Sequence, residues 1–515
     1  MFSRIGAAAV GLIATLVLLA SCGGSQNIWG ACPSYIGAGA ECAVLSVPLD
    51  YTNRTAFETI PLFVFRVKGS AAEKRGQIWF VLGGPGFAAD TLASLFYQLK
   101  DVYPDWDYYA MDHRGTGNSS ILWCPNIPDD EIDSENYQEC LTTLAGEGVD
   151  LSKYTTSNAA HDINFAMDFF RDESKQQFLY GVSYGTYLAE RYLYFFPDRL
   201  DGVILDSICP PGYCYLDQYD ANYNDTAKQI FDLCKQDTTC SARMSEIDDD
   251  PWTAFGMVYD RIDAGTLCDE FKNLITRKLL RNGMVTLLTN STARALMPPL
   301  VYRINRCNAG DVAAVQNFFE VASANIVAPL FSWVETSQFY SPPLASNIIL
   351  SELWNGITLA EAEAMDAAAY VSPDESPKHA SVYDIGGWPI YRNDGSVQQP
   401  GYSDIPVLML NSNIDQATPF SMAEHIQEIF SGEHQTFVTV PYAAHATIVT
   451  SPLIDGSTDV TRYCGMQIMM SFVDNPLAAP DTSCLGEIYE LEFSGTSDFN
   501  RAASATYFGV ENMWE

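Results

Sequence analysis

The sequence predicts an α/β fold with a mostly parallel sheet and a helical region inserted into it. Between residues 76 and 207, short apolar runs alternate with stretches of helical period, which is typical of successive β-α-β units. The alternation fades over 208–399, where long helical patterns dominate, and it resumes over 400–515. A chain of 515 residues is too long for one simple core. A sheet-containing core split by a helical insertion accounts for these observations.

The N-terminal segment has the pattern of a secretory signal. Arg4 precedes an apolar run over 5–20, which is short for a spanning helix. The order Leu19-Ala20-Ser21-Cys22 resembles the bacterial lipobox, which implies cleavage before Cys22 and lipidation of its thiol. An ordinary cleaved signal with an incidental cysteine is the alternative. We therefore expect a lipoprotein signal peptide over 1–21, a linker and disulfide segment over 22–48, and an exported protein anchored to the membrane of a bacterial cell envelope.

The cysteine count also indicates export. Twelve cysteines remain besides Cys22, and an even number is typical of disulfides in an oxidising compartment. Proximity along the chain suggests the pairs Cys32–Cys42, Cys124–Cys140, Cys209–Cys214, Cys234–Cys240, Cys268–Cys307 and Cys464–Cys484. Zinc is the alternative use of cysteine, but the sequence has no C-x-x-C pair and no H-E-x-x-H, so we expect no metal.

The charge excludes one class of partner. Lysine and arginine number 28 against 64 acidic residues, which gives a formal net charge of −36. Such a surface repels phosphate backbones, so nucleic acid is not an expected partner. No G-x-G-x-x-G and no phosphate-loop lysine are present, so the sequence indicates no nucleotide cofactor and no cofactor of any other kind.

The elements of the core can be placed in order. The first part of the core, 49–207, has buried-strand runs at 78–82, 108–111, 178–180 and 203–205, and a helix is expected after Ser157-Asn158. The insertion over 208–399 is interpreted as a helical lid. The second part of the core, 400–515, carries strands at 405–410 and 436–440.

A G-x-S-x-G sequence lies between a predicted strand and a predicted helix. Gly181 and Gly185 flank Ser183, and the period turns helical directly after the serine. A sharp strand-to-helix turn needs small neighbours and raises the hydroxyl above the sheet, as in a nucleophile elbow. Ser183 is therefore the candidate nucleophile, and a chance match in a glycine-rich turn is the alternative.

A serine hydroxyl needs a general base, which a carboxylate in turn orients. Asp415 follows the strand IPVLMLN and His445 follows the strand FVTV, so each lies in a loop after a strand. The order Ser183, Asp415, His445 is that of the α/β-hydrolase triad. Asp206 also ends a strand and is the second candidate for the acid, although it comes early in that order.

Acyl transfer also needs donors for a developing oxyanion. The backbone amide of Tyr184, next to the candidate nucleophile, is one candidate. The turn Gly83-Gly84-Pro85-Gly86 follows a strand and lets the backbone approach a substrate closely, so the amide of Gly84 is the other. A plain tight turn is the alternative for this stretch.

Several motifs together resemble the proline iminopeptidase and tripeptidyl aminopeptidase branch of the α/β-hydrolases. They are GGPG at 83–86, DHRGTGNS at 112–119, GVSYG at 181–185, DQATP at 415–419 and His445, with VPLDY at 47–51, YTT at 154–156 and LDS at 205–207. The region with Cys464, DNPLAAPDTSC and Cys484 resembles the C-terminal segment of the tripeptidyl aminopeptidase group.

The resemblance implies a serine exopeptidase that acts on free N-termini, with Ser183 as nucleophile, Asp415 as orienting acid and His445 as base. Asp112 and Arg114 are expected to brace the loops. Leu82 stands where proline iminopeptidases carry a histidine before GGPG, and the lid holds few matching residues, so the side-chain preference is open.

An aminopeptidase must also bind the substrate's ammonium group, which favours a carboxylate in a partly desolvated pocket. Glu352, in NIILSELW, is the candidate, and a solvated acidic residue is the alternative. The expected enzyme is a monomeric serine aminopeptidase of tripeptidyl or prolyl type that acts on peptides. The other functions considered are a carboxylesterase for small esters and a non-catalytic surface-binding protein.

Overall fold

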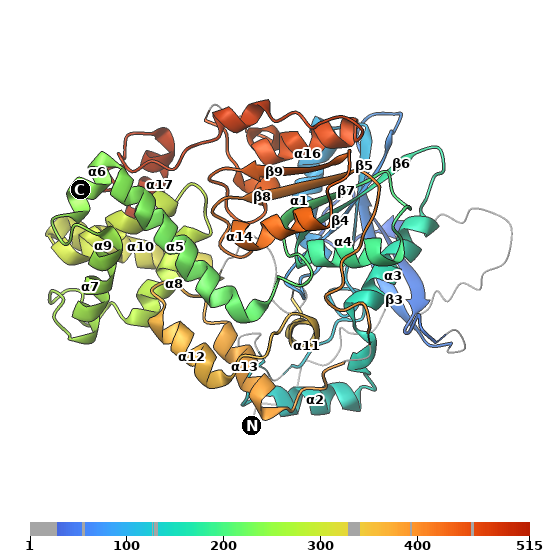
Figure 1. Ribbon diagram of the computed structural model, residues 1–515, viewed down its shortest axis with the longest axis horizontal. Helices are drawn as coiled ribbons and strands as arrows, with labels where there is room; N and C mark the ends of the chain where they lie inside the picture. The colour runs from blue at the N-terminus through green and yellow to red at the C-terminus, as the bar shows by residue number, and fades with distance from the viewer. Residues whose placement is uncertain are drawn as a thin grey trace, which may run out of the picture.

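The fold is built on one sheet of nine strands in the order β1-β2-β3-β5-β4-β6-β7-β8-β9. A computed structural model describes residues 28–53, 57–125, 127, 132–327, 340–391, 394–454 and 458–515 (Figure 1). The strands are β1 (Gly30–Ala31), β2 (Glu41–Pro48), β3 (Thr59–Val67), β4 (Gly76–Val81), β5 (Trp106–Met111), β6 (Gln176–Ser183), β7 (Gly202–Ile208), β8 (Val407–Ser412) and β9 (Gln435–Val440). From β5 across to β9 all neighbouring strands are parallel, whereas β1, β2 and β3 run antiparallel to their neighbours. The prediction of a mostly parallel α/β sheet is confirmed.

The helices outside the insertion come from the two parts of the chain that flank it. They are α1 (Ala93–Val102), α2 (Tyr137–Gly146), α3 (Thr156–Phe169), α4 (Tyr184–Phe195), α14 (Phe420–Ala423), α15 (Thr447–Thr450), α16 (Cys464–Asp474) and α17 (Asp498–Phe508). The 3₁₀ turns among them are η1 (Ala89–Leu92), η3 (Leu151–Lys153), η7 (Glu424–Glu428), η8 (Val460–Arg462) and η9 (Ser483–Glu487). Thr155 caps α3 by accepting a hydrogen bond from the amide of Asn158, close to the helix start that the sequence predicts.

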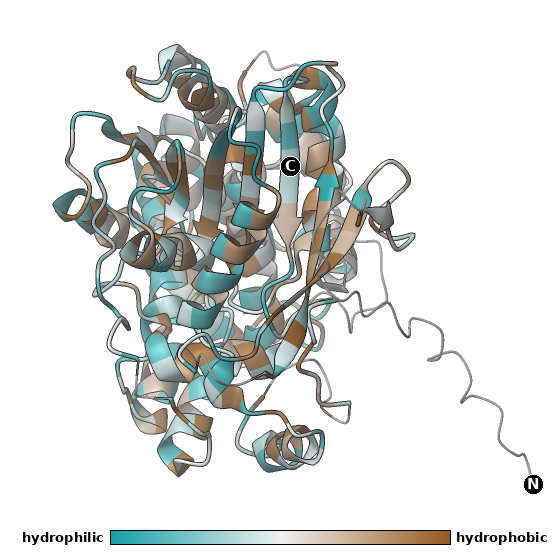
Figure 2. Cartoon of the chain, turned by 90° about the vertical axis from the view of Figure 1, so that its right-hand side faces the viewer, coloured by the Kyte–Doolittle hydropathy of each residue, from teal (hydrophilic) through white to brown (hydrophobic). Residues whose placement is uncertain are grey.

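Side chains on the strands alternate between two cores. In β4, Trp79 and Val81 pack on the face covered by α3 and α4, and Ile78 and Phe80 pack on the face covered by α1 and α16. All four side chains are at most 4% exposed. Figure 2 shows hydrophobic residues along the strands and hydrophilic ones on much of the surrounding helices. The continuous apolar runs of the sequence therefore form strands that are buried on both faces.

The insertion between β7 and β8 is helical, as predicted. Its elements are η4 (Leu216–Gln218), α5 (Tyr219–Gln236), α6 (Thr238–Met244), α7 (Pro251–Asp263), α8 (Arg277–Leu288), η5 (Arg294–Leu296), α9 (Met297–Arg306), α10 (Ala309–Val327), α11 (Pro342–Glu352), α12 (Leu359–Ala368) and α13 (Ser376–Ile385). Many of these helices enclose a third hydrophobic core, which includes Phe231, Phe255 and Phe318.

Two segments differ from the predicted boundaries. Residues 41–48, assigned from the sequence to a linker, form β2, which pairs with β3 over eight residues. At the other end, α17 packs against α10 rather than against the sheet, and Trp514 is buried in the core of the insertion (Figure 1). The predicted signal peptide over 1–21 and Cys22 lie outside the described residues.

All six predicted disulfide pairs are present. They are Cys32–Cys42, Cys124–Cys140, Cys209–Cys214, Cys234–Cys240, Cys268–Cys307 and Cys464–Cys484. Six disulfides indicate an extracytoplasmic protein. In the part of the chain that the structure describes, no helix is both long enough and apolar enough to cross a membrane.

Candidate active site

Ser183 ends β6, and α4 begins at the next residue. Its backbone has φ 59° and ψ −130°, in a region that residues other than glycine rarely adopt. A Cβ atom on Gly181 would lie 2.3 Å from the carbonyl oxygen of Gly185, and one on Gly185 would lie 2.4 Å from that of Val81. The two glycines are therefore required by close backbone packing around the turn, as a nucleophile elbow demands.

The glycine turn after β4 lies directly against Ser183. A Cβ atom on Gly83 would come within 2.6 Å of the Cβ atom of Ser183. Gly84 and Gly86 both have positive φ, at 108° and 113°. The turn that carries the predicted oxyanion donor Gly84 is thus adjacent to the candidate nucleophile, and Tyr184 is the first residue of α4. The oxyanion role of these two amides stays a prediction.

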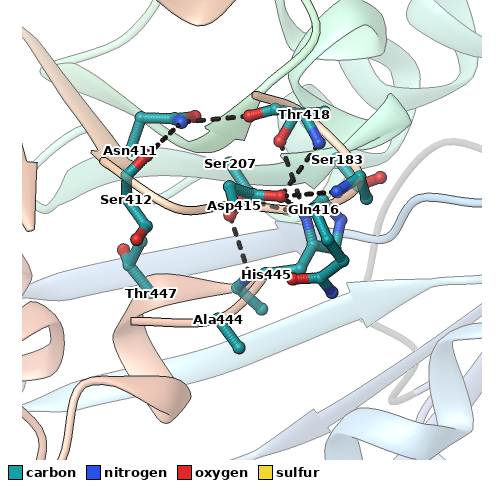
Figure 3. Close-up of polar contacts among 12 residues, drawn as sticks. Ser183, Ser207, Asn411, Ser412, Asp415, Gln416, Thr418, Ala444, His445 and Thr447 are labelled. Atoms are coloured by element: carbon teal, nitrogen blue, oxygen red, sulfur yellow. Dashed lines mark hydrogen bonds and ion pairs between the residues drawn. The ribbon is translucent and has the colours of Figure 1, made fainter. Parts of the chain in front are cut away.

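Asp415 and His445 form a hydrogen-bonded pair beyond the carboxyl ends of β8 and β9 (Figure 3). The Nδ1 atom of His445 lies 3.0 Å from both carboxylate oxygens of Asp415. The amides of Ala417 and Thr418 each donate to Oδ1 of Asp415 at 2.9 Å. The carboxylate is 1% exposed, so its orientation is fixed by the loop around it.

Ser207 links this pair to the strand beside Ser183. Its Oγ atom accepts a hydrogen bond from the amide of Ala446 at 2.8 Å, and its hydroxyl also hydrogen-bonds the carboxylate of Asp415. In the sheet, Ser183 pairs with Ile208, the next residue of β7. Sequence reasoning assigned Ser207 no role, although its place at a strand end, within the LDS match, was a signal.

The two charges of the pair stabilise each other. Burial alone would raise the pKa of Asp415, but His445 and the hydrogen bonds from Thr418 and Ser207 hold it below its usual value. Burial alone would lower the pKa of His445, but the carboxylate of Asp415 outweighs it and raises the pKa above its usual value. An imidazole held in this way can accept a proton and keep it while a reaction proceeds.

Asp206, the second candidate for the acid, has a different environment. Its Oδ1 atom accepts a hydrogen bond from the amide of Thr447 at 2.9 Å, and its Oδ2 atom accepts from the hydroxyl of Tyr180 at 2.8 Å and from the amide of Ile448 at 3.2 Å. It therefore fixes the start of α15, two residues beyond His445. The carboxylate bonded to His445 is that of Asp415.

Asp112 and Arg114 brace loops, as predicted. The two oxygens of Asp112 accept from the amides of Ala89 at 2.8 Å and Asn118 at 2.7 Å. Arg114 forms a wholly buried ion pair with Asp162 at 2.7 Å. The loops after β4 and β5 are held to the core through these contacts.

Glu352 is buried against side chains of α4. None of its described hydrogen bonds is with Asp415 or His445. Its Oε2 atom accepts from Tyr187 and from Arg191, each at 3.0 Å. Its Oε1 atom accepts from Tyr391 at 2.6 Å and from the amide of Thr156 at 3.2 Å. The side chain is 2% exposed. Its proposed role as an ammonium ligand stays a prediction.

Among the described residues, one group has the spacing of metal ligands, and it comprises Cys268, Glu270 and Cys307. The two cysteines form a disulfide with each other, so their sulfur atoms are not available as thiolate ligands.

Comparison with known families fits this geometry. Residues 80–241 match the model described as "alpha/beta hydrolase fold", and residues 380–463 match the model described as "TAP-like protein". These ranges contain Ser183 in the first and Asp415 with His445 in the second. In these two stretches the chain is similar to the tripeptidyl-aminopeptidase-like branch of the α/β-hydrolases.

Curated relatives match part of the chain. A tripeptidyl aminopeptidase from Streptomyces lividans is 28% identical over 196 residues, which are 33% of this chain and 36% of the relative. The serine protease Hip1 of Mycobacterium tuberculosis is 28% identical over 202 residues, 34% of this chain and 37% of that protein. The chain thus matches little more than a third of the length of these relatives.

Solved structures align over more of the chain but only loosely. A thermophilic esterase from Thermogutta terrifontis aligns at 13% identity and a TM-score of 0.30, covering 78% of this chain and 91% of the esterase.

Proposed function

We propose that the protein is an exported serine exopeptidase that releases short peptides or amino acids from free N-termini through an acyl-enzyme on Ser183. The observation that carries the proposal is the buried Asp415–His445 pair, joined through Ser207 to the strand beside the strained Ser183. The relatives named as a tripeptidyl aminopeptidase and a serine protease support a peptidase over other hydrolases.

In the proposed mechanism, His445 takes the proton of the Ser183 hydroxyl as its oxygen attacks the peptide carbonyl carbon. The amides of Tyr184 and Gly84 donate to the oxyanion that develops. The protonated His445, stabilised by Asp415, then gives its proton to the leaving amine, and an acyl-enzyme remains. Water attacks the acyl-enzyme by the same route and restores Ser183.

Exopeptidase action requires that long chains be kept from entering the site from both sides. The helical insertion contacts the glycine turn itself, because the amide of Ser341, just before α11, donates to the carbonyl of Gly86 at 2.9 Å. The rings of Phe87 and Tyr340 lie 5.0 Å apart at the same junction. A covered glycine turn supports exclusion of internal peptide segments.

We further propose that the protein is held to the membrane through a lipid on Cys22. The support is the lipobox order of residues 19–22. The location outside the cytoplasm agrees with the six disulfides, and the anchor itself is testable by mass spectrometry of the N-terminal peptide with Cys22→Ser as the control.

The proposed activity is tested by comparing amine release from free and N-acetylated mono-, di- and tripeptidyl anilides, with short p-nitrophenyl esters alongside. Ser183→Ala is the control. Release that needs both a free amine and Ser183 is the expected result, and the best substrate length then identifies the exopeptidase type. Ester turnover without cleavage of any amide would identify an esterase and contradict the proposal.

A further inference from the structure

Arg294, at the start of η5 in the helical insertion, contacts both loops of the candidate acid–base pair. Its guanidinium is wholly buried and donates four hydrogen bonds. Nε donates to the carbonyl of Leu288 at 2.6 Å, and Nη2 donates to Oε1 of Gln416 at 2.6 Å. Nη1 donates to the carbonyls of Ile414 and Ala443, each at 3.0 Å. Nη1 therefore joins Ile414, the residue before Asp415, to Ala443, which lies two positions before His445.

The same two loops are also linked directly through neutral groups. The hydroxyl of Ser412, at the end of β8, donates to the carbonyl of Ala443 at 2.7 Å, and the amide of Tyr442 donates to Oδ1 of Asn413 at 2.9 Å. The carbonyl of Ala443 therefore accepts hydrogen bonds from Ser412 and from Arg294. Without Arg294, the backbone carbonyl of Ile414 and the side-chain oxygen of Gln416 would lose their charged hydrogen-bond donor. The separation of the two loops sets the 3.0 Å contact between Asp415 and His445.

Arg294 differs from the other wholly buried arginines in its partners. Arg114, Arg191 and Arg303 each form an ion pair with a carboxylate, namely Asp162, Glu352 and Asp311. Within the described part of the chain, the hydrogen bonds of Arg294 go to three carbonyls and one amide oxygen, all neutral. A buried charge without a bonded counter-ion is costly, so its retention needs a compensating interaction.

The compensating charge is that of Asp415. Burial lowers the pKa of Arg294 to about 10, and the carboxylate of Asp415 counteracts this. The guanidinium in turn opposes protonation of His445, against the effects of Asp415 and Asp206. The remaining ionisable groups around this cluster are Tyr223, which faces Arg294 and hydrogen-bonds Gln416, and beyond it Tyr219 and Glu375.

We propose that Arg294 is a positioning residue that couples the helical insertion to the acid–base pair, by joining the Asp415 and His445 loops and by placing a fixed positive charge beside them. The inference rests on the proposed function of Ser183, Asp415 and His445. It makes the insertion part of the catalytic architecture as well as a cover over the substrate.

The test compares Arg294→Gln, Arg294→Lys and the wild type by measuring kcat/KM against pH on the best anilide substrate. Removing the charge in Arg294→Gln raises the pKa of His445, so the midpoint of the acidic limb moves up by about half a pH unit or more. Loss of the loop contacts lowers the plateau of kcat/KM by about 10- to 100-fold. Arg294→Lys keeps the charge but cannot bridge the same acceptors, so the midpoint stays while the plateau falls.

Arg303→Gln is the matched control. Arg303 is another wholly buried arginine of the insertion, and it bonds the carbonyls of Asn512, Met513 and Glu515 rather than the catalytic loops. We expect this variant to lose thermal stability and to keep the wild-type midpoint. If Arg294→Gln does not fold, Arg294→Lys decides the question: a plateau reduced at least about tenfold, with KM little changed, supports positioning.

Wild-type kcat and midpoint in folded Arg294→Gln or Arg294→Lys would overturn the inference while the proposed function stands. If the Ser183→Ala variant hydrolysed the substrate as fast as the wild type, both the inference and the proposed function would be overturned, because the reaction would not occur at this site.

Discussion

Ser183, Asp415 and His445 are held by backbone groups of the loops that carry them. The φ of 59° at Ser183 fixes the direction of its side chain, and two amides fix the carboxylate of Asp415. The residue after His445 is held by Ser207. Such groups need little rearrangement when charge develops, which is the condition for electrostatic catalysis.

A first prediction concerns Glu352→Gln. Because the described contacts of this carboxylate are all with protein donors, we expect the variant to remove the closer counter-ion of buried Arg191, leaving only Asp394 at 3.7 Å, and to lower the free energy of unfolding by about 3 kcal/mol. Chemical denaturation measures the change. Glu190→Gln is the control, since Glu190, which lies on α4, is also buried but neither of its oxygens has a hydrogen-bond partner in the described structure.

The same variant separates the two roles of Glu352. If the side chain only holds α4 in place, kcat/KM falls by the same factor for free-amine anilides and for short p-nitrophenyl esters, which carry no ammonium group. A rise in KM confined to free-amine substrates, at unchanged stability, would show that Glu352 binds the substrate ammonium, as the sequence suggested.

At the residue scale, the sequence could identify groups that follow a motif or a strand end. Ser183, Asp415 and His445 were predicted because each type of residue comes at the end of a strand and in a known order. Arg294 could not be predicted, because an arginine in a helical stretch is usually exposed and its contacts with Ile414 and Ala443 depend on packing over more than a hundred residues.

The glycine turn after β4 packs directly against Ser183 and leaves no room for a side chain at Gly83. We predict that Gly83→Ala reduces kcat/KM by about 100-fold or more, because the added Cβ atom would lie 2.6 Å from that of Ser183 and must displace one of the two backbones. Steady-state kinetics measure the loss. Gly146→Ala is the control, since a Cβ atom there meets nothing within 4 Å, and near-wild-type kinetics in Gly83→Ala would contradict the packing described.

Asp90, in η1 directly after this turn, makes stability depend on pH. Burial, and then the charge of Asp112, raise the pKa of Asp90 to about 7. Above about pH 4 the unfolded chain releases a proton that the folded chain retains, so this group lowers stability progressively as pH rises from about 4 to about 7. Its Oδ1 atom has no hydrogen-bond partner in the described structure.

Asp90→Asn should therefore raise the free energy of unfolding at pH 8 by about 1–2 kcal/mol and leave it nearly unchanged at pH 4. Urea denaturation at the two pH values measures the difference. Asp112→Asn should act in the opposite direction, because the oxygens of Asp112 accept amide hydrogen bonds that an asparagine cannot fully replace. An Asp90→Asn variant less stable than the wild type at pH 8 would refute this account.

At the element scale, the parallel strands and the nucleophile helix were predictable because apolar runs and helical periods are local signals. The role of β2 was not, because its antiparallel pairing with β3 depends on tertiary packing and not on a local pattern. Likewise, α17 follows the sheet in sequence but contacts the insertion, and only its packing against α10 shows this.

The whole molecule combines a two-faced sheet core with a third core in the insertion, and disulfides fasten all three regions. Peptide mapping without reduction should recover six linked pairs, and the pair Cys268–Cys307 within the insertion provides a specific test. Replacing both of these cysteines with serine should lower the free energy of unfolding by about 2–5 kcal/mol. Recovery of free thiols at these positions in the native protein would contradict the structure.

The central claim is that Ser183 is a nucleophile activated by His445 and Asp415. The most direct measurement is to treat the purified protein with a fluorophosphonate and to locate the adduct by mass spectrometry of the digested chain. We expect about one equivalent of label on the peptide that contains Ser183, none in Ser183→Ala, and labelling slowed by about 1,000-fold in His445→Gln. A label on a different residue, or equal labelling of Ser183→Ala, would contradict the account.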